Sequence, residues 1–450
     1  MRYILILIFA GNSLQLFSQD TLSLANAIQL SLERNYDIVI ENKRTDIASN
    51  NNTWGQAGRY PSVELFIGQN NNLTDNIKTA NPFQLQGKTL SNGISPGIAM
   101  NWVLFDGFRV SIQKSRLEQL QAESNGNAEI VISNTIQATI LSYYAVVLQE
   151  ELLTELQRQL KLSRDKLDYV KVKSEIGSAV SSDILLEETN YLNDSTNYLN
   201  QILSHRNAKR NLNFILAEQN PDKEYVFSDK LQLTLEDYAL QDLILKMEES
   251  NSDLRKQYIS ESIRQYDVQL AKSEKYPSVT FSGGFTNNNS RVDLSNAYRV
   301  NNDGSYTQGS SEPLTAVSNN LFANFRVSFT LFNGGRINTA ISNAYLQEEI
   351  SSLTTEKIKL SLYRDMSSTL DEYNMRKQVL GINDRKLEVA QKNLNIANEK
   401  FRNGTINSFD FRTVQNNQLS AAIQRLVSLY NVIDSQIGLM RLTGGILEYR

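Results

Sequence analysis

The sequence predicts an α+β fold in which one unit, made of long coiled-coil helices and two strands, occurs twice. Tyr-Pro-Ser-Val occurs at residues 60–63 and again at residues 276–279. The same later motifs follow each copy in the same order: LFDG at 104–107 and IGSAVSSD at 176–183, then LFNG at 331–334 and NGTINSFD at 403–410. Within each copy the hydrophobic period changes from two to seven. These observations together indicate an internal duplication.

Each Tyr-Pro motif opens a predicted strand. Apolar residues such as Val63, Leu65 and Ile67 alternate with other residues, and this alternation is typical of a strand with two different faces. Proline ends the incoming helix and is tolerated at the first position of a strand. A second strand follows across a loop rich in Asn, Ser and Gly. The four expected strands are about 61–70, 96–105, 277–286 and 323–332.

The remaining segments have helical periodicity. Leucines recur every seven residues at Leu153, Leu160 and Leu167, which is typical of helices packed side by side with slight supercoiling. The expected helices are 22–58, 107–176 and 182–217 in a first repeat (19–217), then, after a linker (218–236), 237–274, 334–402 and 408–443 in a second repeat (237–445). A helix of about 70 residues is roughly 105 Å long, so each repeat is expected to form a long rod.

The N-terminus and the composition restrict the compartment and the class of protein. Residues 1–18 combine an early positive charge with an apolar run, as a cleaved signal peptide does. The chain has no cysteine, which excludes disulfides and an acylated N-terminal Cys. No later segment approaches the roughly 18 apolar residues of a membrane-spanning helix. The net charge of −4 provides no basic surface for nucleic acid.

Four strands of about ten residues can cross an outer membrane but cannot close a barrel, whose minimum is about eight strands, so we expect the chain to oligomerise. The order of helix, Tyr-Pro strand, second strand ending in LFDG or LFNGG, long helix, tip and returning helix resembles the TolC-like outer-membrane efflux proteins. The resemblance covers nearly the whole mature chain. It implies a homotrimer in which twelve strands form one outer-membrane β-barrel, continued across the periplasm by an α-helical barrel.

The same resemblance implies the function and the partners. The trimer would be a passive exit duct of a tripartite efflux or type I secretion system, in the cell outer membrane with a periplasmic extension. It would dock to a periplasmic membrane-fusion adaptor protein and to an inner-membrane transporter of the RND or ABC type. Outer-membrane lipid would surround the barrel, and neither a cofactor, nor a metal, nor nucleic acid is expected.

The resemblance also indicates candidate sites at the inner ends of the helices. The helical tips that would contact the adaptor contain Gly177, Ser178, Gly404 and Thr405. Asp410 and Asp183 stand six residues beyond the tip glycines and would form acidic rings at the pore constriction, unless they only stabilise helix N-termini. The family has a second acid three residues after Asp410, where this chain has Thr413. The aromatic and basic latch residues of some relatives are here Phe401 and Ile406.

Two other classes of function compete with the duct. A non-transporting coiled-coil scaffold or surface adhesin would need the heptads but no paired membrane strands with long polar loops. An enzyme is disfavoured because the sequence has no Ser/His/Asp set and no carboxylate and histidine cluster with ligand spacing. His205 is the only histidine, and it lies on a row of apolar residues at seven-residue spacing, which is typical of packing.

Overall fold

The computed structural model describes residues 21–77, 85–232, 234–301 and 303–449, so the predicted signal peptide (1–18) lies outside the described residues. The chain divides into two compact units, and neither is a sequence repeat. Unit 1 contains the residues up to Thr45, Ser124–Gln257 and the residues from Thr355 onward. Unit 2 contains Asp46–Glu123 and Tyr258–Thr354. Each unit therefore combines segments from both repeats.

Unit 1 is helical, apart from two short strands. Its elements include α1 (Leu24–Arg34), α4 (Ser181–Ile215), α5 (Leu240–Ser250), α8 (Ser408–Leu442) and η1 (Gly445–Tyr449). Most of α3 (Arg109–Glu175) and α7 (Arg336–Arg402), which have 67 residues each, also belongs to it. The short strands β1 (Thr21–Leu22) and β4 (Val226–Phe227) pair in parallel.

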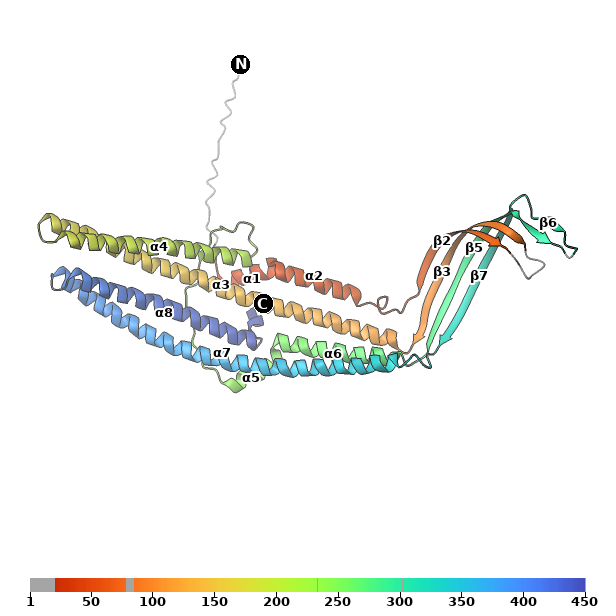
Figure 1. The fold of residues 1–450 in the computed structure, drawn as a ribbon. Coiled ribbons are helices and arrows are strands. Elements are labelled where there is room, and N and C mark those ends of the chain that lie inside the picture. The colour runs from red at the N-terminus through yellow and green to blue at the C-terminus, as the bar shows by residue number, and fades with distance from the viewer. Residues whose placement is uncertain (1–20, 78–84, 233, 302, 450) are drawn as a thin grey trace, which may run out of the picture. The chain divides into compact units, whose positions relative to one another are not determined.

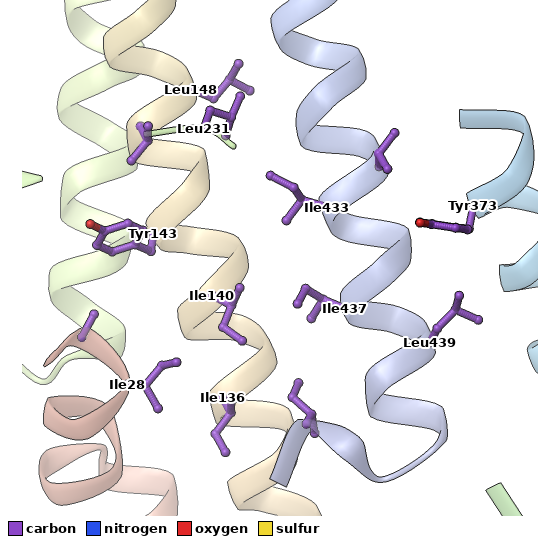
Figure 2. Close-up of a cluster of buried hydrophobic side chains, with 14 of the residues drawn as sticks. Ile28, Ile136, Ile140, Tyr143, Leu148, Leu231, Tyr373, Ile433, Ile437 and Leu439 are labelled. Atoms are coloured by element: carbon purple, nitrogen blue, oxygen red, sulfur yellow. The ribbon is translucent and has the colours of Figure 1, made fainter. Parts of the chain in front are cut away.

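The core of unit 1 lies along the long helices. Ile136, Ile140 and Tyr143 of α3 are buried at helical spacing, as are Tyr373 of α7 and Ile433 of α8 (Figure 2). Fully burying one such aliphatic side chain contributes about 1.5–3 kcal/mol. The Tyr143 hydroxyl donates to the Leu22 carbonyl oxygen at 2.9 Å, so the tyrosine also joins α3 to the small sheet. Of the leucines found at seven-residue spacing in the sequence, Leu167 is buried, whereas Leu153 and Leu160 are only partly buried.

One expectation about these helices is wrong. Within α3 there is an 18-residue stretch that is long and apolar enough to cross a membrane by length and composition, and half of it is buried inside the chain. The stretch lies where α3 supplies core residues such as Ile136 and Ile140. A core helix surrounded by other helices passes the same test as a spanning helix, so its apolar character is explained by packing.

The first helix of each repeat is interrupted by an asparagine. The expected helix 22–58 is observed as α1 and α2 (Tyr36–Asn51) but ends at Asn51, because residues 52–58 form a turn; the expected helix 237–274 is observed as α5 and α6 (Ser252–Ser273). Asn35 and Asn251 separate the two parts with extended ψ angles of 127° and 120°. Their side-chain amides donate to the carbonyl oxygens of Ile215 and Leu442, the last residues of α4 and α8, at 2.9 Å each. The two asparagines therefore hydrogen-bond to the C-terminal ends of the returning helices α4 and α8.

Unit 2 contains one antiparallel sheet with the strand order β2-β3-β5-β7, in which the short strand β6 (Tyr306–Gln308) also pairs with β5 (Figure 1). The long strands are β2 (Ser62–Asn76), β3 (Gln86–Asp106), β5 (Ser278–Val300) and β7 (Leu314–Ser328). They have 15, 21, 23 and 15 residues, more than the ten expected from alternation. The expected strand 323–332 is wrong at its end, because β7 ends at Ser328 and residues 329–332 are not in a strand. The Asn- and Ser-rich segments expected as loops continue the ladder, because backbone hydrogen bonds do not require apolar side chains.

The strand register gives the sheet one apolar face. Leu65, Ile98, Phe285 and Leu321 lie opposite one another across the four strands. Leu65 and Leu321, on the two outer strands, are each 83% exposed. On the opposite face, a row three positions away is polar throughout and consists of Ser62, Asn101, Ser282 and Asn324, while the row next to the leucines is mixed and includes Glu64 and Phe322. A sheet with one exposed apolar face and one polar face is what a lipid-facing barrel wall requires.

Candidate functional site: the hairpin tips of unit 1

Two helical hairpins of unit 1, α3–α4 and α7–α8, end in turns of the same construction. Gly177 and Gly404 adopt left-handed φ angles of 73° and 72°. The next backbone N–H donates back into the preceding helix, from Ser178 to the Lys173 oxygen at 2.8 Å and from Thr405 to the Lys400 oxygen at 2.9 Å. This is the Schellman arrangement that ends many helices, and it favours glycine because a Cβ is disfavoured at that φ.

Both tips are open to their surroundings. A Cβ built on Gly177 or on Gly404 would meet no atom of the described chain within 4 Å. Ser178 and Thr405 are both exposed, and the Thr405 hydroxyl donates to the Lys400 carbonyl oxygen at 2.9 Å. Intramolecular packing therefore does not explain these positions, and they remain accessible to another molecule.

The two aspartates expected at the constriction have different surroundings. The Asp183 carboxylate accepts the Val180 backbone N–H at 3.3 Å at the start of α4, where the N-cap residue Val180 has no side-chain acceptor. At the start of α8 the cap is Asn407, whose side-chain oxygen accepts the Asp410 backbone N–H at 2.8 Å. The exposed Asp410 carboxylate is therefore not needed for capping. Asp183 matches the helix-terminus interpretation, whereas Asp410 is available for another role.

Thr413 lies on the same exposed side of α8 as Asp410, one turn further on. Its hydroxyl donates to the Phe409 carbonyl oxygen at 3.1 Å, within its own helix. Ile406 lies in the tip, and the Phe401 ring is stacked on the Phe411 ring with centroids 4.8 Å apart. Phe401 also contacts the other hairpin, because its ring centroid lies 6.1 Å from that of Tyr169 on α3.

A buried ion pair that the sequence analysis missed joins the two hairpins beneath their tips. The Arg412 guanidinium of α8 donates to both carboxylate oxygens of Asp194 of α4, at 2.6 and 2.7 Å. The Asp194 side chain is 3% exposed. It also accepts hydrogen bonds from Ser163 and, at 3.3 Å, from Gln159, both of α3. A buried carboxylate with this many donors is held in a single geometry.

A second buried pair lies closer to the tips. Lys166 of α3 and Glu187 of α4 are 2.9 Å apart, with side chains 5% and 1% exposed. The lysine also donates to the Ser408 carbonyl oxygen at 3.1 Å, and its ammonium lies 5.0 Å from the ring centroids of Phe401 and Phe411. Burial lowers the pKa of Lys166, and the Glu187 carboxylate opposes that shift. The lysine thus connects the first hairpin to both helices of the second.

A signal for these pairs was present in the sequence. Glu187 and Asp194 are seven residues apart on α4, so they form a charged row among apolar rows of the same period. A charged row is more often a solvated face, and only the packing of α4 shows that this one is buried. No group of three or more His, Asp or Glu side chains that could hold a metal ion occurs in the described ranges.

Comparison with known proteins matches part of the chain to a family. Residues 243–445, in the second repeat, match the family model of the outer membrane efflux proteins. The second repeat is thus similar to the outer membrane efflux proteins. No curated protein matches the sequence of the chain. The predicted relation to TolC-like outer-membrane efflux proteins is confirmed, as is the localisation in the outer membrane with a periplasmic extension.

Solved outer membrane channels share the fold over nearly the whole chain. The Campylobacter jejuni CmeC outer membrane channel has a TM-score of 0.74 at 14% identity, over 94% of this chain and 85% of that one. The open state of the Neisseria gonorrhoeae MtrE outer membrane channel has a TM-score of 0.70 at 14% identity, over 94% and 89%. The Vibrio cholerae outer membrane protein VceC has a TM-score of 0.70 at 12% identity, over 94% and 96%. The first repeat, which lies outside the family match, therefore has the efflux-channel fold as well.

Proposed function

We propose that three copies of this outer-membrane efflux channel form one passive exit duct, which docks through its hairpin tips to a periplasmic adaptor and an inner-membrane pump. The observation that carries the proposal is the sheet of unit 2. It combines an exposed apolar face with two outer strands of 15 residues each.

The outer strands favour assembly through the sheet. Within the described part of the chain, β2 pairs only with β3 and β7 pairs only with β5. Backbone N–H and C=O groups that face hydrocarbon without partners cost several kcal/mol each, so a membrane sheet must close on itself. Four strands are too few for closure, whereas three copies supply twelve. Two copies would supply the minimum of eight, and the family resemblance favours three.

Apolar stripes on the helices favour the same assembly. Leu185, Leu192 and Leu199 of α4 are exposed at seven-residue spacing. The second stripe, on α7, consists of Met375, Ile382, Val389 and Ile396, all exposed. A seven-residue apolar seam is the surface that a neighbouring helix covers in a coiled coil. A second copy of the chain, with the same long helices, is the partner that matches this spacing.

Cross-linking between the outer strands tests the assembly. Ser62 of β2 and Ser328 of β7 lie at the same end of the sheet and are separated within one chain by three inter-strand spacings and by four residues along the strands, roughly 19 Å in all. Between adjacent copies they would be neighbours. In a Ser62→Cys/Ser328→Cys variant of this cysteine-free chain, a thiol cross-linker spanning about 8 Å should therefore give covalent dimers and trimers on denaturing gels.

Each single-cysteine variant serves as the control and should remain monomeric on the gel. If the double-cysteine variant gives covalent dimers but no trimers on the gel, the assembly is an eight-stranded dimer and not a trimer. A variant that stays monomeric while the protein conducts ions in a bilayer would contradict the closed-sheet proposal. A membrane-bound assembly that never conducts would instead favour the non-transporting scaffold.

Docking at the tips is tested by replacing the tip glycines. Gly177→Ala/Gly404→Ala and Gly177→Trp/Gly404→Trp impose the same backbone strain at positive φ, about 1–2 kcal/mol per site. Neither side chain would meet the described chain at its Cβ. The tryptophan variant alone should lose export, measured with compounds to which cells lacking the chain become sensitive, while its trimer remains intact. Equal export by both variants would show that docking occurs elsewhere.

A further inference from the structure

A groove in unit 2 lies where the sheet meets the helices. It has a volume of about 400 Å³. Three segments of the fold line it: the turn before β2, which supplies Trp54 and Arg59, the end of β3 from Trp102 to Asp106, and the start of α3, where Phe108, Val110 and Ser111 contribute. It opens at the end of the apolar face described above. None of its residues belongs to the tips or to the buried ion pairs of unit 1.

Aromatic side chains gather at this level of the molecule. The chain contains two tryptophans, Trp54 and Trp102, and both line the groove. Tyr60 and Tyr276, of the two Tyr-Pro motifs, are exposed; Tyr60 follows Arg59, and the Tyr276 ring lies 6.5 Å from the Phe108 ring. Exposed Trp and Tyr side chains at the ends of membrane strands are typical of the level of the lipid headgroups. The groove therefore lies at the expected boundary between bilayer and water.

The turn that forms one wall of the groove is strained. Gly107 and Phe108 have φ angles of 69° and 68° in succession. In the second repeat the corresponding residues are Gly334 and Gly335, with φ angles of 71° and 82°. A phenylalanine at positive φ costs about 1–2 kcal/mol that glycine avoids. The first repeat thus keeps an aromatic ring, 64% exposed, at a position where the second repeat has the residue that fits the backbone.

Arg59 supplies the charge. Its guanidinium carbon lies 4.6 Å from the centre of the Trp54 ring, and its carbonyl oxygen accepts the Trp102 indole N–H at 2.9 Å. Among the described residues, Arg59 has no carboxylate partner within ion-pair distance. Two other charged groups nearby already have partners. The Lys114 ammonium contacts Glu118 at 2.6 Å, and the Asp106 carboxylate accepts the Val110 N–H at 3.3 Å. Arg59 is therefore a planar cation, stacked on an indole, with its donors available.

We propose that this groove binds the phosphate group of a membrane phospholipid, with Arg59 as the phosphate ligand and the acyl chains lying beyond Trp102 along the apolar face. Guanidinium groups bind phosphate oxygens through paired, charge-assisted hydrogen bonds. The aromatic walls accommodate the glycerol and the upper acyl chain. The inference rests on the proposed function, because it requires the sheet to stand in the bilayer. It adds a specific lipid site on one repeat, since the second repeat has Lys275 and Phe329 in place of Arg59 and Trp102.

Tryptophan fluorescence reports on this site directly, since both tryptophans line it. The full-length protein in detergent micelles is titrated with phosphatidylglycerol that carries bromine on its acyl chains, which quenches nearby indoles. Arg59→Gln should raise the half-saturating lipid fraction about tenfold, because a hydrogen bond to a charged group contributes at least one factor of ten. Phe108→Gly, which installs the residue of the second repeat, should raise it as well without backbone strain. Arg109→Gln is the matched control, because Arg109 pairs with Glu274 at 3.5 Å and does not line the groove; its titration should equal that of the wild type.

Two further arms separate the causes. A brominated detergent without phosphate should quench the tryptophan fluorescence of wild type and Arg59→Gln equally. Equal quenching shows that in both proteins the groove contacts the apolar part of the micelle. If that detergent quenches neither, the sheet does not stand in the membrane and the proposed function fails with the lipid site. If lipid quenching is equal in wild type and Arg59→Gln while the detergent quenches both, only the lipid site is refuted. Millimolar inorganic phosphate should not relieve quenching by the lipid; relief would identify a site for free phosphate and overturn the proposal.

Discussion

Replacing Asp194 with alanine is expected to lower the free energy of unfolding by about 3–5 kcal/mol, because it leaves the Arg412 guanidinium buried without its counter-charge. The carboxylate is 3% exposed and accepts two guanidinium hydrogen bonds of 2.6 and 2.7 Å. Its loss also removes the acceptor of Ser163 and Gln159 on α3. The change in free energy is measured from denaturant unfolding followed by helical circular dichroism.

The matched control is another ion pair to α8. Arg425 of α8 and Asp384 of α7 are 2.7 Å apart, but both side chains are more than a third exposed. Asp384→Ala should cost less than about 1 kcal/mol. A double variant, Asp194→Leu/Arg412→Met, should recover most of the stability, since it removes both buried charges. Equal, small losses for Asp194→Ala and Asp384→Ala would show that the pair beneath the tips is not an essential connection between the hairpins.

In single-channel recordings, Asp410→Ala is expected to raise the concentration of a trivalent cation needed for half-block, applied from the periplasmic side, by at least about tenfold. One charge pair at 4 Å contributes about 1 kcal/mol even in water, and a threefold ring of exposed Asp410 carboxylates would multiply that attraction. Asp183→Ala should change the block much less, because the Asp183 carboxylate accepts the Val180 N–H at its helix terminus.

The position of the second family acid provides a reciprocal test. Thr413 is exposed one turn beyond Asp410, and its hydroxyl makes only a bond within its own helix in the described structure. Thr413→Asp should therefore add a second ring and strengthen the block at unchanged fold stability. Equal block in wild type, Asp410→Ala and Thr413→Asp would show that neither position lines the narrowest part of the pore.

The repeated motifs predicted more of the fold than their length would indicate. Asn35 and Asn251 occupy equivalent positions in the two repeats, separated by the same number of residues as the two Tyr-Pro motifs. Their role as helix breaks became clear only from their side-chain hydrogen bonds to the carbonyl oxygens of Ile215 and Leu442. Alternation located the apolar part of each strand, as with Val63, Leu65 and Ile67, but it could not show how far the strands extend. The polar segments that follow have no periodic signal, and their strand structure depends on the ladders to neighbouring strands.

For the candidate site, local spacing located the two tips and the two aspartates, because a tip glycine with left-handed φ and an acid in the next helical turn are local features of the chain. The difference between Asp183 and Asp410 follows from the residue at each N-cap: Val180 has no side-chain acceptor, whereas the Asn407 side chain accepts the Asp410 backbone N–H. This difference in residue type was present in the sequence.

The sequence by itself determined the duplication, the alternation of long helices with paired strands and the resemblance to the outer membrane efflux proteins, because these follow from local periodicity and from motif order. Only the tertiary structure decided that Arg412 and Asp194, 218 residues apart, form one buried pair, and that Trp54, Arg59 and Trp102 line one groove. Such contacts depend on the axial register of packed helices and on the path of a turn. A shift of one helical turn, about 5.4 Å, would separate the charges without changing any local pattern.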